Sequence, residues 1–345
     1  MNEASQRPEF GRFFLPGPTE VHPDVLDRQR DPMIAHRGKE MERLLSGMID
    51  PLKRIFRTVD RHPLIGSCSA TGFMEMAVRC GVRHRVLSLV GGAFGERFAA
   101  IAAACGCEVV RLNVPLGRTV EPEMVDEALQ RSDVDAVTLV HSETSTGALA
   151  PLADLANVVH GFDDVLLLVD GVTSVGGLPV ETDDWDLDFV LTGSQKAFAL
   201  PPGLALAVAS ERMLERAKHL PDRGAYLDVI PHVEALQRCQ PPNTPALSLL
   251  YALDEQLARI ESEGGVEGRW DRHRKMLETV ERWVDGRGGE LGFSYLPVLD
   301  RRSWTVSCLN APAGVNGRDI VVRLRDLGWV IGTGYGDLKE ETIRI

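Results

Sequence analysis

Residues 165–196 read VLLLVDGVTSVGGLPVETDDWDLDFVLTGSQK, and this stretch decides the fold class. It holds two short apolar runs, Val165–Val169 and Phe189–Leu191, and each run gives way to glycine and polar residues. Short continuous apolar runs are typical of strands that are buried on both faces of a sheet. Asp170 follows the first run directly, and Lys196 comes shortly after the second. We therefore predict two neighbouring buried strands, each with an ionisable residue near its carboxyl end.

The same pattern extends on both sides of this stretch, from about residue 64 to residue 209. Five more apolar runs occur there, with helix-like segments between the earlier ones: Leu64–Ile65, Val86–Val90, Val109–Leu112, Ala136–Val140 and Leu204–Val208. Short buried strands that alternate with helices indicate a parallel sheet covered on both faces. We therefore predict an α/β fold with a mostly parallel seven-stranded sheet flanked by helices. Ligands of such sheets bind at the carboxyl ends of the strands.

The pattern changes beyond residue 209. The proline-rich residues 240–245 interrupt the chain,. Helical patterns then alternate with strand-like runs, at residues 247–264, 268–284, 304–309, 318–327 and 329–331. We expect three parts, namely an N-terminal arm (1–20), a large domain (21–245) and a smaller C-terminal α/β domain (246–345).

Composition and charge exclude several classes of protein. Hydrophobic residues make up 44% of the 345 residues and the net charge is −12, which argues against a nucleic-acid partner,. No apolar run has the length of a membrane span, and Met1–Arg12 lacks the apolar core of a signal peptide,. We therefore expect a cytoplasmic protein without a membrane partner. The six cysteines lack a zinc-binding spacing, so we expect reduced thiols and no metal site,.

Asp170 and Lys196 are the candidates for catalysis. A carboxylate at the end of a buried strand needs a cation or a donor nearby, although a turn or helix cap would also explain it. Desolvation of Lys196 would lower its pKa and favour the neutral amine that forms a Schiff base, whereas a surface lysine would only cover apolar residues with its stem. Pyridoxal phosphate requires both groups, a lysine at its aldehyde and an acid at its pyridine nitrogen. The pair therefore predicts a pyridoxal-phosphate site.

Other strand ends carry residues that suit the same cofactor. Ser67–Gly72 opens a helix with small hydroxyl residues, which can bind a phosphate through backbone N–H groups or simply cap the helix,. Phe94 lies between small residues and could stack on a ring or pack in the core,. His141–Gly147 is a further polar cluster after a predicted strand. Together these strand ends suggest one shared crevice.

The motifs resemble those of the class V aminotransferases, particularly the alanine–glyoxylate and serine–glyoxylate aminotransferase group. This group consists of pyridoxal-phosphate enzymes of fold type I, and the likeness covers nearly the whole chain. It is carried by Phe14–Thr19, Ile34–Gly38, Ser69–Gly72, Glu143–Gly147, Asp170–Val172, Gly193–Lys196, Asn243–Pro245 and Glu341–Ile345.

The resemblance implies cofactor-binding roles. Lys196 would form the Schiff base and then move the proton, and Asp170 would pair with the pyridinium. The other cofactor contacts would be phosphate binding by Ser69, Ala70, Thr71 and Gln195, ring packing by Phe94 and Val172, and a position near the ring hydroxyl for Thr144. Thr244 would reach the phosphate of the neighbouring subunit, which implies a homodimer with shared active sites.

The resemblance also implies substrate-binding roles. Arg344 would bind the substrate α-carboxylate as a bidentate partner, with the Gly17 loop beside it. His36 and Arg37 would lie near the distal end of the substrate in either subunit, or would only make backbone contacts at a helix start. The implied reaction transfers an amino group from a small L-amino acid, such as alanine or serine, to glyoxylate or pyruvate.

The chain departs from the family in two places. Residues 240–242 replace a tyrosine that relatives often carry before the threonine at 244, so one phosphate contact would be missing or supplied by another residue. The chain also ends just after Arg344, where relatives continue, so we expect a truncated small domain and a poorly held arginine.

Two other functions remain open. A cysteine desulfurase or related lyase would need a nucleophilic cysteine in a mobile loop, and only Cys308 lies late in the chain. A catalytically impaired protein that retains the fold would bind the cofactor without turnover, or would not bind it.

Overall fold

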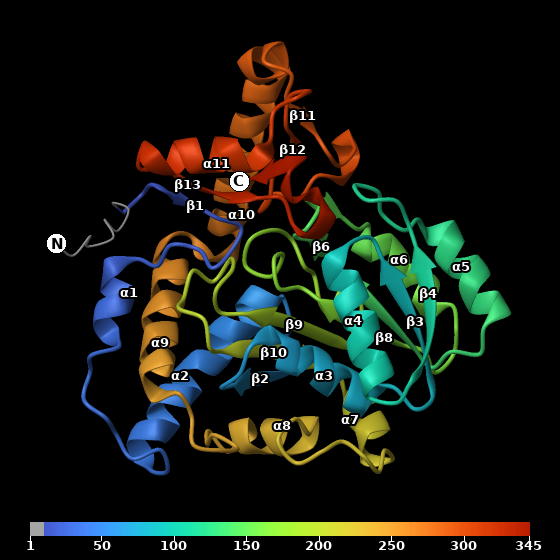
Figure 1. The fold of residues 1–345 in the computed structure, drawn as a ribbon. Helices are drawn as coiled ribbons and strands as arrows, with labels where there is room; N and C mark the ends of the chain where they lie inside the picture. Colours follow the sequence, from blue (N-terminus) through green and yellow to red (C-terminus); the bar gives the residue numbers. More distant parts are fainter. Residues whose placement is uncertain (1–9) are drawn as a thin grey trace.

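The computed structural model describes residues 10–345, so the first nine residues of the expected N-terminal arm lie outside the described part. The central feature is a seven-stranded sheet, and a smaller five-stranded sheet lies above it (Figure 1). The order of the large sheet is β2 (His62–Gly66), β10 (Ala205–Ala209), β9 (Phe189–Gly193), β8 (Leu166–Asp170), β5 (Ala136–Val140), β3 (Arg85–Val90) and β4 (Glu108–Asn113). Only β10 runs opposite to the other strands of this sheet, which confirms the predicted mostly parallel sheet.

Side chains alternate between two cores on the two faces of the large sheet. In β8, Leu167 and Val169 face one core, whereas Leu166 and Leu168 face the other. The first core includes residues of α2 (Lys39–Phe56), α5 (Pro122–Arg131), α6 (Leu152–His160) and α9 (Leu247–Ser262). The second includes residues of α3 (Ala70–Gly81), α4 (Ala93–Ala104), α7 (Glu211–Lys218) and α8 (Val229–Gln237). Burial on both faces explains why these strands are apolar throughout rather than alternating.

Strand register brings the polar strand ends to the same level. Asp170, the last residue of β8, pairs with Val140 at the end of β5 and with Leu191 in β9. The residues that follow these three strands therefore emerge side by side at one edge of the sheet. One of the loops that leave this edge forms a short hairpin, β6 (Ser142–Glu143) with β7 (Ala148–Leu149).

The smaller sheet combines the two ends of the described chain. Its order is β1 (Phe13–Phe14), β13 (Val330–Thr333), β14 (Thr342–Arg344), β12 (Cys308–Asn310) and β11 (Ser294–Tyr295). β1 pairs with β13 in parallel, so residues of the expected arm extend the C-terminal sheet. The remaining elements are α1 (Pro23–Arg28), α10 (Gly265–Trp283), α11 (Gly317–Asp326) and short turns at Val284–Gly288, Leu299–Arg301 and Gly336–Lys339.

The strand expected at residues 304–309 is shorter than predicted, because only Cys308–Asn310 pairs within the small sheet. The preceding residues bond instead to loops that follow strands of the large sheet. Ser303 N–H donates to Gly147 O at 2.9 Å, and the Thr305 hydroxyl donates to Thr173 O at 2.7 Å. This segment therefore ties the small sheet to the loops at the carboxyl edge of the large one.

No helix within residues 10–345 combines the length and the apolar character that crossing a bilayer requires. All six cysteines are free thiols. Among the described residues, no group of three or more His, Cys, Asp or Glu side chains is arranged to hold a metal ion.

Arg216 in α7 provides a test of the fold at the amino edge of the large sheet. Its buried guanidinium donates to Gly81 O, Asp135 O and both the carbonyl and carboxylate of Asp164, at 2.6–3.0 Å. Arg216→Met removes a buried cation that bonds the buried Gly81 O and the half-buried Asp135 O, so we expect the free energy of unfolding to fall by about 2 kcal/mol,. Urea unfolding of the purified variant measures this loss.

Lys218→Met, two residues further along the same helix, is the matched control. Its partner Glu215 and Lys218 itself are both exposed, so the unfolding midpoint should barely move. Equal losses in the two variants would contradict the role given to Arg216.

Candidate active site

Lys196 and Asp170 are both buried at the carboxyl edge of the large sheet, 9% and 3% exposed. The pKa of Lys196 is lowered to about 8, mainly by burial and also by the charges of Arg344 and Arg97, while the charge of Asp170 acts in the opposite direction. Burial raises the pKa of Asp170 to about 7, although an N–H from Val172 at 2.8 Å and the charge of Lys196 work against this rise. The amine therefore loses its proton more easily than an ordinary lysine does. The buried carboxyl group needs a cationic partner to stabilise its ionised form.

The loop that carries Lys196 is held through three successive carbonyl groups. Lys196 O accepts a hydrogen bond from the Thr19 hydroxyl at 3.1 Å. Ala197 O accepts one from the Arg269 guanidinium at 2.6 Å, and Phe198 O accepts one from the Gln256 amide at 2.7 Å. Thr19 comes from the N-terminal segment, Gln256 from α9 and Arg269 from α10. Three distant parts of the chain therefore fix the backbone on which the lysine side chain depends.

Gly17 lies directly against the side chain of Lys196. A Cβ at this position would be 2.4–2.7 Å from the Cδ, Cε and Nζ atoms of the lysine, which is too close for any side chain. The neighbouring Thr19 N–H donates to Gln195 O at 3.0 Å. Glycine at 17 thus lets the N-terminal segment cover the amine. A cavity of about 850 Å³ adjoins this segment and is lined partly by Lys196, Thr19 and Arg269.

Glu143 organises the start of α4. Its buried carboxylate accepts N–H bonds from Phe94 at 3.1 Å and from Gly95 at 3.0 Å, and it also accepts the hydroxyl of Ser145. A Cβ at Gly92 would lie 2.5 Å from both Glu143 and Ser145, so the backbone can approach only as glycine. The carboxylate satisfies N–H groups that a helix start leaves unpaired. It therefore fixes the half-buried Phe94, the residue expected to stack on a ring.

Arg344 is held firmly, and the expectation that it would be poorly held is wrong. Its guanidinium donates to Thr333 O at 2.9 Å and to Thr144 O at 3.0 Å. The next residue, Ile345, exchanges two backbone hydrogen bonds with Ser307. Burial lowers the pKa of Arg344. The strand pairing of β14 thus carries the arginine to the site and links it to Thr144, whose hydroxyl bonds that of Thr173 at 2.5 Å.

The residues expected at the phosphate gather at the start of α3. A Cβ at Gly193 would lie 2.7 Å from the Gln195 side-chain oxygen and 3.2 Å from Ala70, which places both beside this helix start. Ser69 is the N-cap residue, and its hydroxyl makes no capping hydrogen bond; Ser69 and Thr71 are exposed. The start of α3 therefore has no side-chain cap, and a helix start of this kind can accept an anion,.

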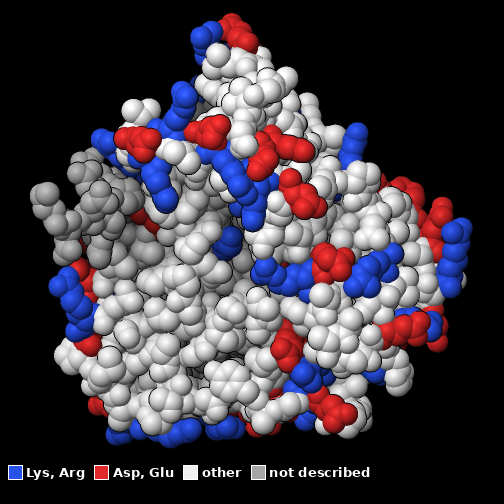
Figure 2. Space-filling model, viewed as in Figure 1, with Lys and Arg blue, Asp and Glu red and all other residues white. Residues whose placement is uncertain are grey.

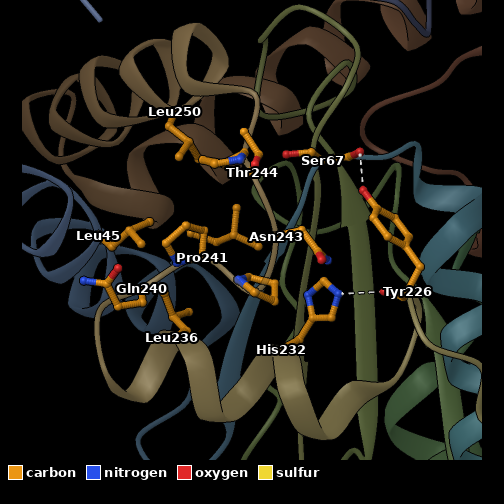
Figure 3. Close-up of a pocket in the computed structure, with 13 residues that line it drawn as sticks. Leu45, Ser67, Tyr226, His232, Leu236, Gln240, Pro241, Asn243, Thr244 and Leu250 are labelled. Carbon is orange, nitrogen blue, oxygen red and sulfur yellow. Dashed lines mark hydrogen bonds between the residues drawn. The ribbon is translucent and has the colours of Figure 1, made fainter. Parts of the chain in front are cut away.

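Thr244 lies in a separate small pocket, about 30 Å³ in volume, near the same helix (Figure 3). The pocket also contains Ser67, Tyr226 and His232. The Tyr226 hydroxyl donates to Ser67 O at 3.3 Å, and the Ser67 hydroxyl accepts an N–H from Ala246 at 2.9 Å. Thr244 itself is exposed. Although residues 240–242 lack a tyrosine, the hydroxyl of Tyr226 thus lies in the same pocket as Thr244.

His36 and Arg37 are not brought to Lys196 by any contact within residues 10–345. They lie between α1 and α2, where His36 is half-buried and Arg37 is exposed. Val172, in contrast, lies beside Asp170, and its carbonyl accepts the hydroxyl of Thr192 at 3.2 Å.

Sequence reasoning missed several residues of this site. Glu143 lies within the predicted polar cluster His141–Gly147, and Arg97 lies one helical turn after Phe94, so the sequence offered a clue to both residues. Arg269 and Gln256 gave none, because they lie in helical stretches with ordinary amphipathic patterns.

The described residues fit pyridoxal phosphate. They offer a buried amine with a lowered pKa, a carboxyl group at the same edge of the sheet, and a helix start that has no side-chain cap. The backbone at Gly17 and Gly92 approaches too closely for side chains, which shapes a narrow space.

Comparison with known proteins agrees with this geometry. The class V aminotransferase family profile matches residues 96–334. An uncharacterized aminotransferase of Methanocaldococcus jannaschii is 39% identical over 308 residues, which is 88% of this chain and 78% of the relative. The alanine–glyoxylate aminotransferase of Rattus norvegicus is 31% identical and covers 96% of this chain and 81% of its own length. The solved aspartate aminotransferase of subgroup IV from Thermus thermophilus is 32% identical, with a TM-score of 0.85. The match covers 96% of this chain and 92% of the solved chain.

The chain therefore belongs to the class V aminotransferase family and is a pyridoxal-phosphate-dependent transaminase. The predicted family, fold and enzyme class are confirmed. 

Glu143→Ala tests the arrangement around α4. The variant removes the acceptor of two N–H groups at a helix start, so we expect a loss of about 1–2 kcal/mol in stability. We also expect weaker cofactor binding, because Phe94 loses its anchor. Thermal unfolding of the cofactor-free protein and a fluorescence titration with pyridoxal phosphate measure the two effects. Glu96→Ala, an exposed residue of the same helix paired with Arg111, should change neither; unchanged binding in Glu143→Ala would contradict the model of an anchored Phe94.

Proposed function

We propose that this transaminase moves an amino group from a small L-amino acid, such as alanine or serine, to glyoxylate or pyruvate. The observation that carries the proposal is the buried pair of Lys196 and Asp170, with Arg344 close enough to lower the pKa of the amine. The relative from Rattus norvegicus is named for alanine and glyoxylate, which supports these substrates.

Different residues of the site serve proton transfer, cofactor orientation and substrate binding. Pyridoxal phosphate, when bound, supplies the aldehyde that takes up the amino group and a ring that withdraws electrons. The Lys196 amine takes the proton from the substrate α-carbon and returns it, and its lowered pKa makes it a base near neutral pH,. The Asp170 carboxylate keeps a proton on the pyridine nitrogen, and the burial of both groups excludes water from them,.

Substrate and cofactor are held by the surrounding residues. We assign the substrate α-carboxylate to the remaining N–H groups of Arg344, beside Gly17,. Ser69, Ala70, Thr71 and Gln195 would bind the phosphate of the cofactor, Phe94 and Val172 would pack against its ring, and Thr144 would lie near the ring hydroxyl.

We further propose a homodimer in which the exposed Thr244 completes the phosphate site of the partner subunit. Tyr226, in the same pocket, replaces the hydroxyl that residues 240–242 lack. His36 and Arg37 would contact the substrate across such an interface, because within residues 10–345 neither lines the cavity beside Lys196.

A desulfurase or lyase is the weaker alternative. Cys308 is fully buried in β12, and burial raises its pKa to about 11. A thiol in this state is a poor nucleophile, and its strand is not a mobile loop. The geometry therefore favours transamination over sulfur chemistry.

The lowered pKa of Lys196 predicts how cofactor uptake depends on pH. Only the neutral amine reacts with the aldehyde, so the rate of uptake by the cofactor-free protein should rise up to about pH 8 and then level off,. An ordinary lysine would continue to gain reactivity to above pH 10. Stopped-flow absorbance of the developing visible band gives the profile, and a continued rise past pH 10 would argue against a desolvated lysine.

Lys196→Ala should abolish the visible band and all turnover while leaving the fold intact. Absorbance spectra of the wild type, recorded with alanine, serine, aspartate and cysteine in turn, identify the donor that bleaches the band. Glyoxylate or pyruvate should then restore it. A wild-type spectrum that responds to no amino acid would refute the proposed reaction.

A further inference from the structure

Arg97 is a second arginine at the candidate site that the proposed reaction has not yet used. It lies in α4, one helical turn after Phe94, and its guanidinium carbon is 4.7 Å from the centre of the Phe94 ring. One terminal nitrogen donates to the Tyr335 hydroxyl at 3.0 Å. The side chain is half-buried. The guanidinium thus lies over the Phe94 ring and uses one donor on Tyr335. Its other N–H groups remain for a ligand.

Tyr335 brings the two arginines of the site together. Arg97 bonds to its hydroxyl, and the guanidinium of Arg344 lies 5.5 Å from the centre of its ring. The gap between the two guanidinium groups is therefore limited to about one tyrosine side chain and its two contacts. Both cations also lower the pKa of Lys196, which places their charge close to the amine.

Arg97 forms no ion pair with an Asp or Glu side chain anywhere in residues 10–345. The nearby Glu96 pairs with Arg111 instead, at 3.2 Å. Glu143 is occupied by the start of α4, and Asp170 by the N–H of Val172. A half-buried cation that lacks a counter-charge favours an anion supplied by a ligand. Figure 2 shows basic side chains at the hollow where the small domain meets the large one.

We propose that Arg97 binds a second carboxylate of the substrate, so that among small L-amino acids the enzyme prefers the short dicarboxylic donor aspartate over alanine and serine. Arg344 takes the α-carboxylate and Arg97 the side-chain carboxylate, on either side of Tyr335. The proposal deepens the proposed transamination and rests on it. The short span set by Tyr335 suits a four-carbon acid, and a planar guanidinium fork matches a carboxylate in geometry as well as charge.

Arg97→Met in the cofactor-loaded enzyme is the direct test. We expect the ratio of kcat/KM for aspartate to kcat/KM for alanine to fall roughly 100-fold, because a charge-assisted hydrogen-bonded pair is lost only for aspartate. Arg97→Lys keeps the charge but loses the fork, and should recover part of the ratio. Arg111→Met removes an equal charge from the same face of the protein, where Arg111 pairs with Glu96, and should leave the ratio unchanged.

A binding measurement makes the test independent of turnover and of any variant that fails to fold. Succinate should change the cofactor spectrum of the wild-type holoenzyme at a much lower concentration than butyrate. Butyrate has the same number of carbon atoms and one carboxylate fewer. This preference should vanish in Arg97→Met. An equal affinity for the two acids in the wild type would overturn the proposal, as would a donor ratio that survives Arg97→Met.

The outcomes separate this inference from the proposed function. If no amino acid alters the cofactor spectrum, transamination itself is refuted. If alanine and aspartate both react, and Arg97→Met slows them equally, the transaminase stands and the assignment of Arg97 falls. A stronger preference for phosphoserine than for aspartate would overturn the carboxylate assignment, because the same guanidinium would then be reading a phosphate.

Discussion

The burial of one amine and one carboxyl group in the same small space is the constraint on which the site depends. Water would stabilise Lys196 and Asp170 as ions, and its exclusion moves the pKa of the amine down and that of the acid up,. Neither group could be kept there by an apolar core alone, since each unpaired charge would be costly. The register of β5, β8 and β9 places them at one edge of the sheet, so that each offsets part of the cost of the other.

Exclusion of water requires parts of the chain that are far apart in sequence. The Lys196 loop is covered by Gly17 and held by side chains from the N-terminal segment, α9 and α10. The small sheet supplies Arg344, which in turn bonds to the backbone of Thr144. Since β1 extends that small sheet, its pairing with β13 also sets where Gly17 lies. The site is thus assembled only when the small sheet and the large sheet are packed together, and local structure around the lysine is not sufficient.

Sequence patterns predicted what is local and repetitive, and failed where the determinants are distant. Each strand of the large sheet contains a short run rich in apolar residues, so all seven were predictable, as were Asp170 and Lys196 at strand ends. The strand predicted at residues 304–309 is too long, because Ser303 and Thr305 bond to loops at the edge of the large sheet rather than to a neighbouring strand. Nothing in α10 marks Arg269 as different from its arginine neighbours; only the approach of Ala197 O gives it a role.

The charge of the site runs opposite to that of the whole chain. The net charge is −12, which repels an anionic substrate at long range,. Screening by salt confines that repulsion to about 10 Å or less from the surface. Within the cleft, Arg97 and Arg344 act at short range in a poorly hydrated space, where each charge counts for more than one on the surface,. Two cations flanking Tyr335 can therefore attract a dianion in spite of the acidic exterior. A substrate with one carboxylate would leave one of them without a counter-charge, and this imbalance is the physical basis for discrimination between the two.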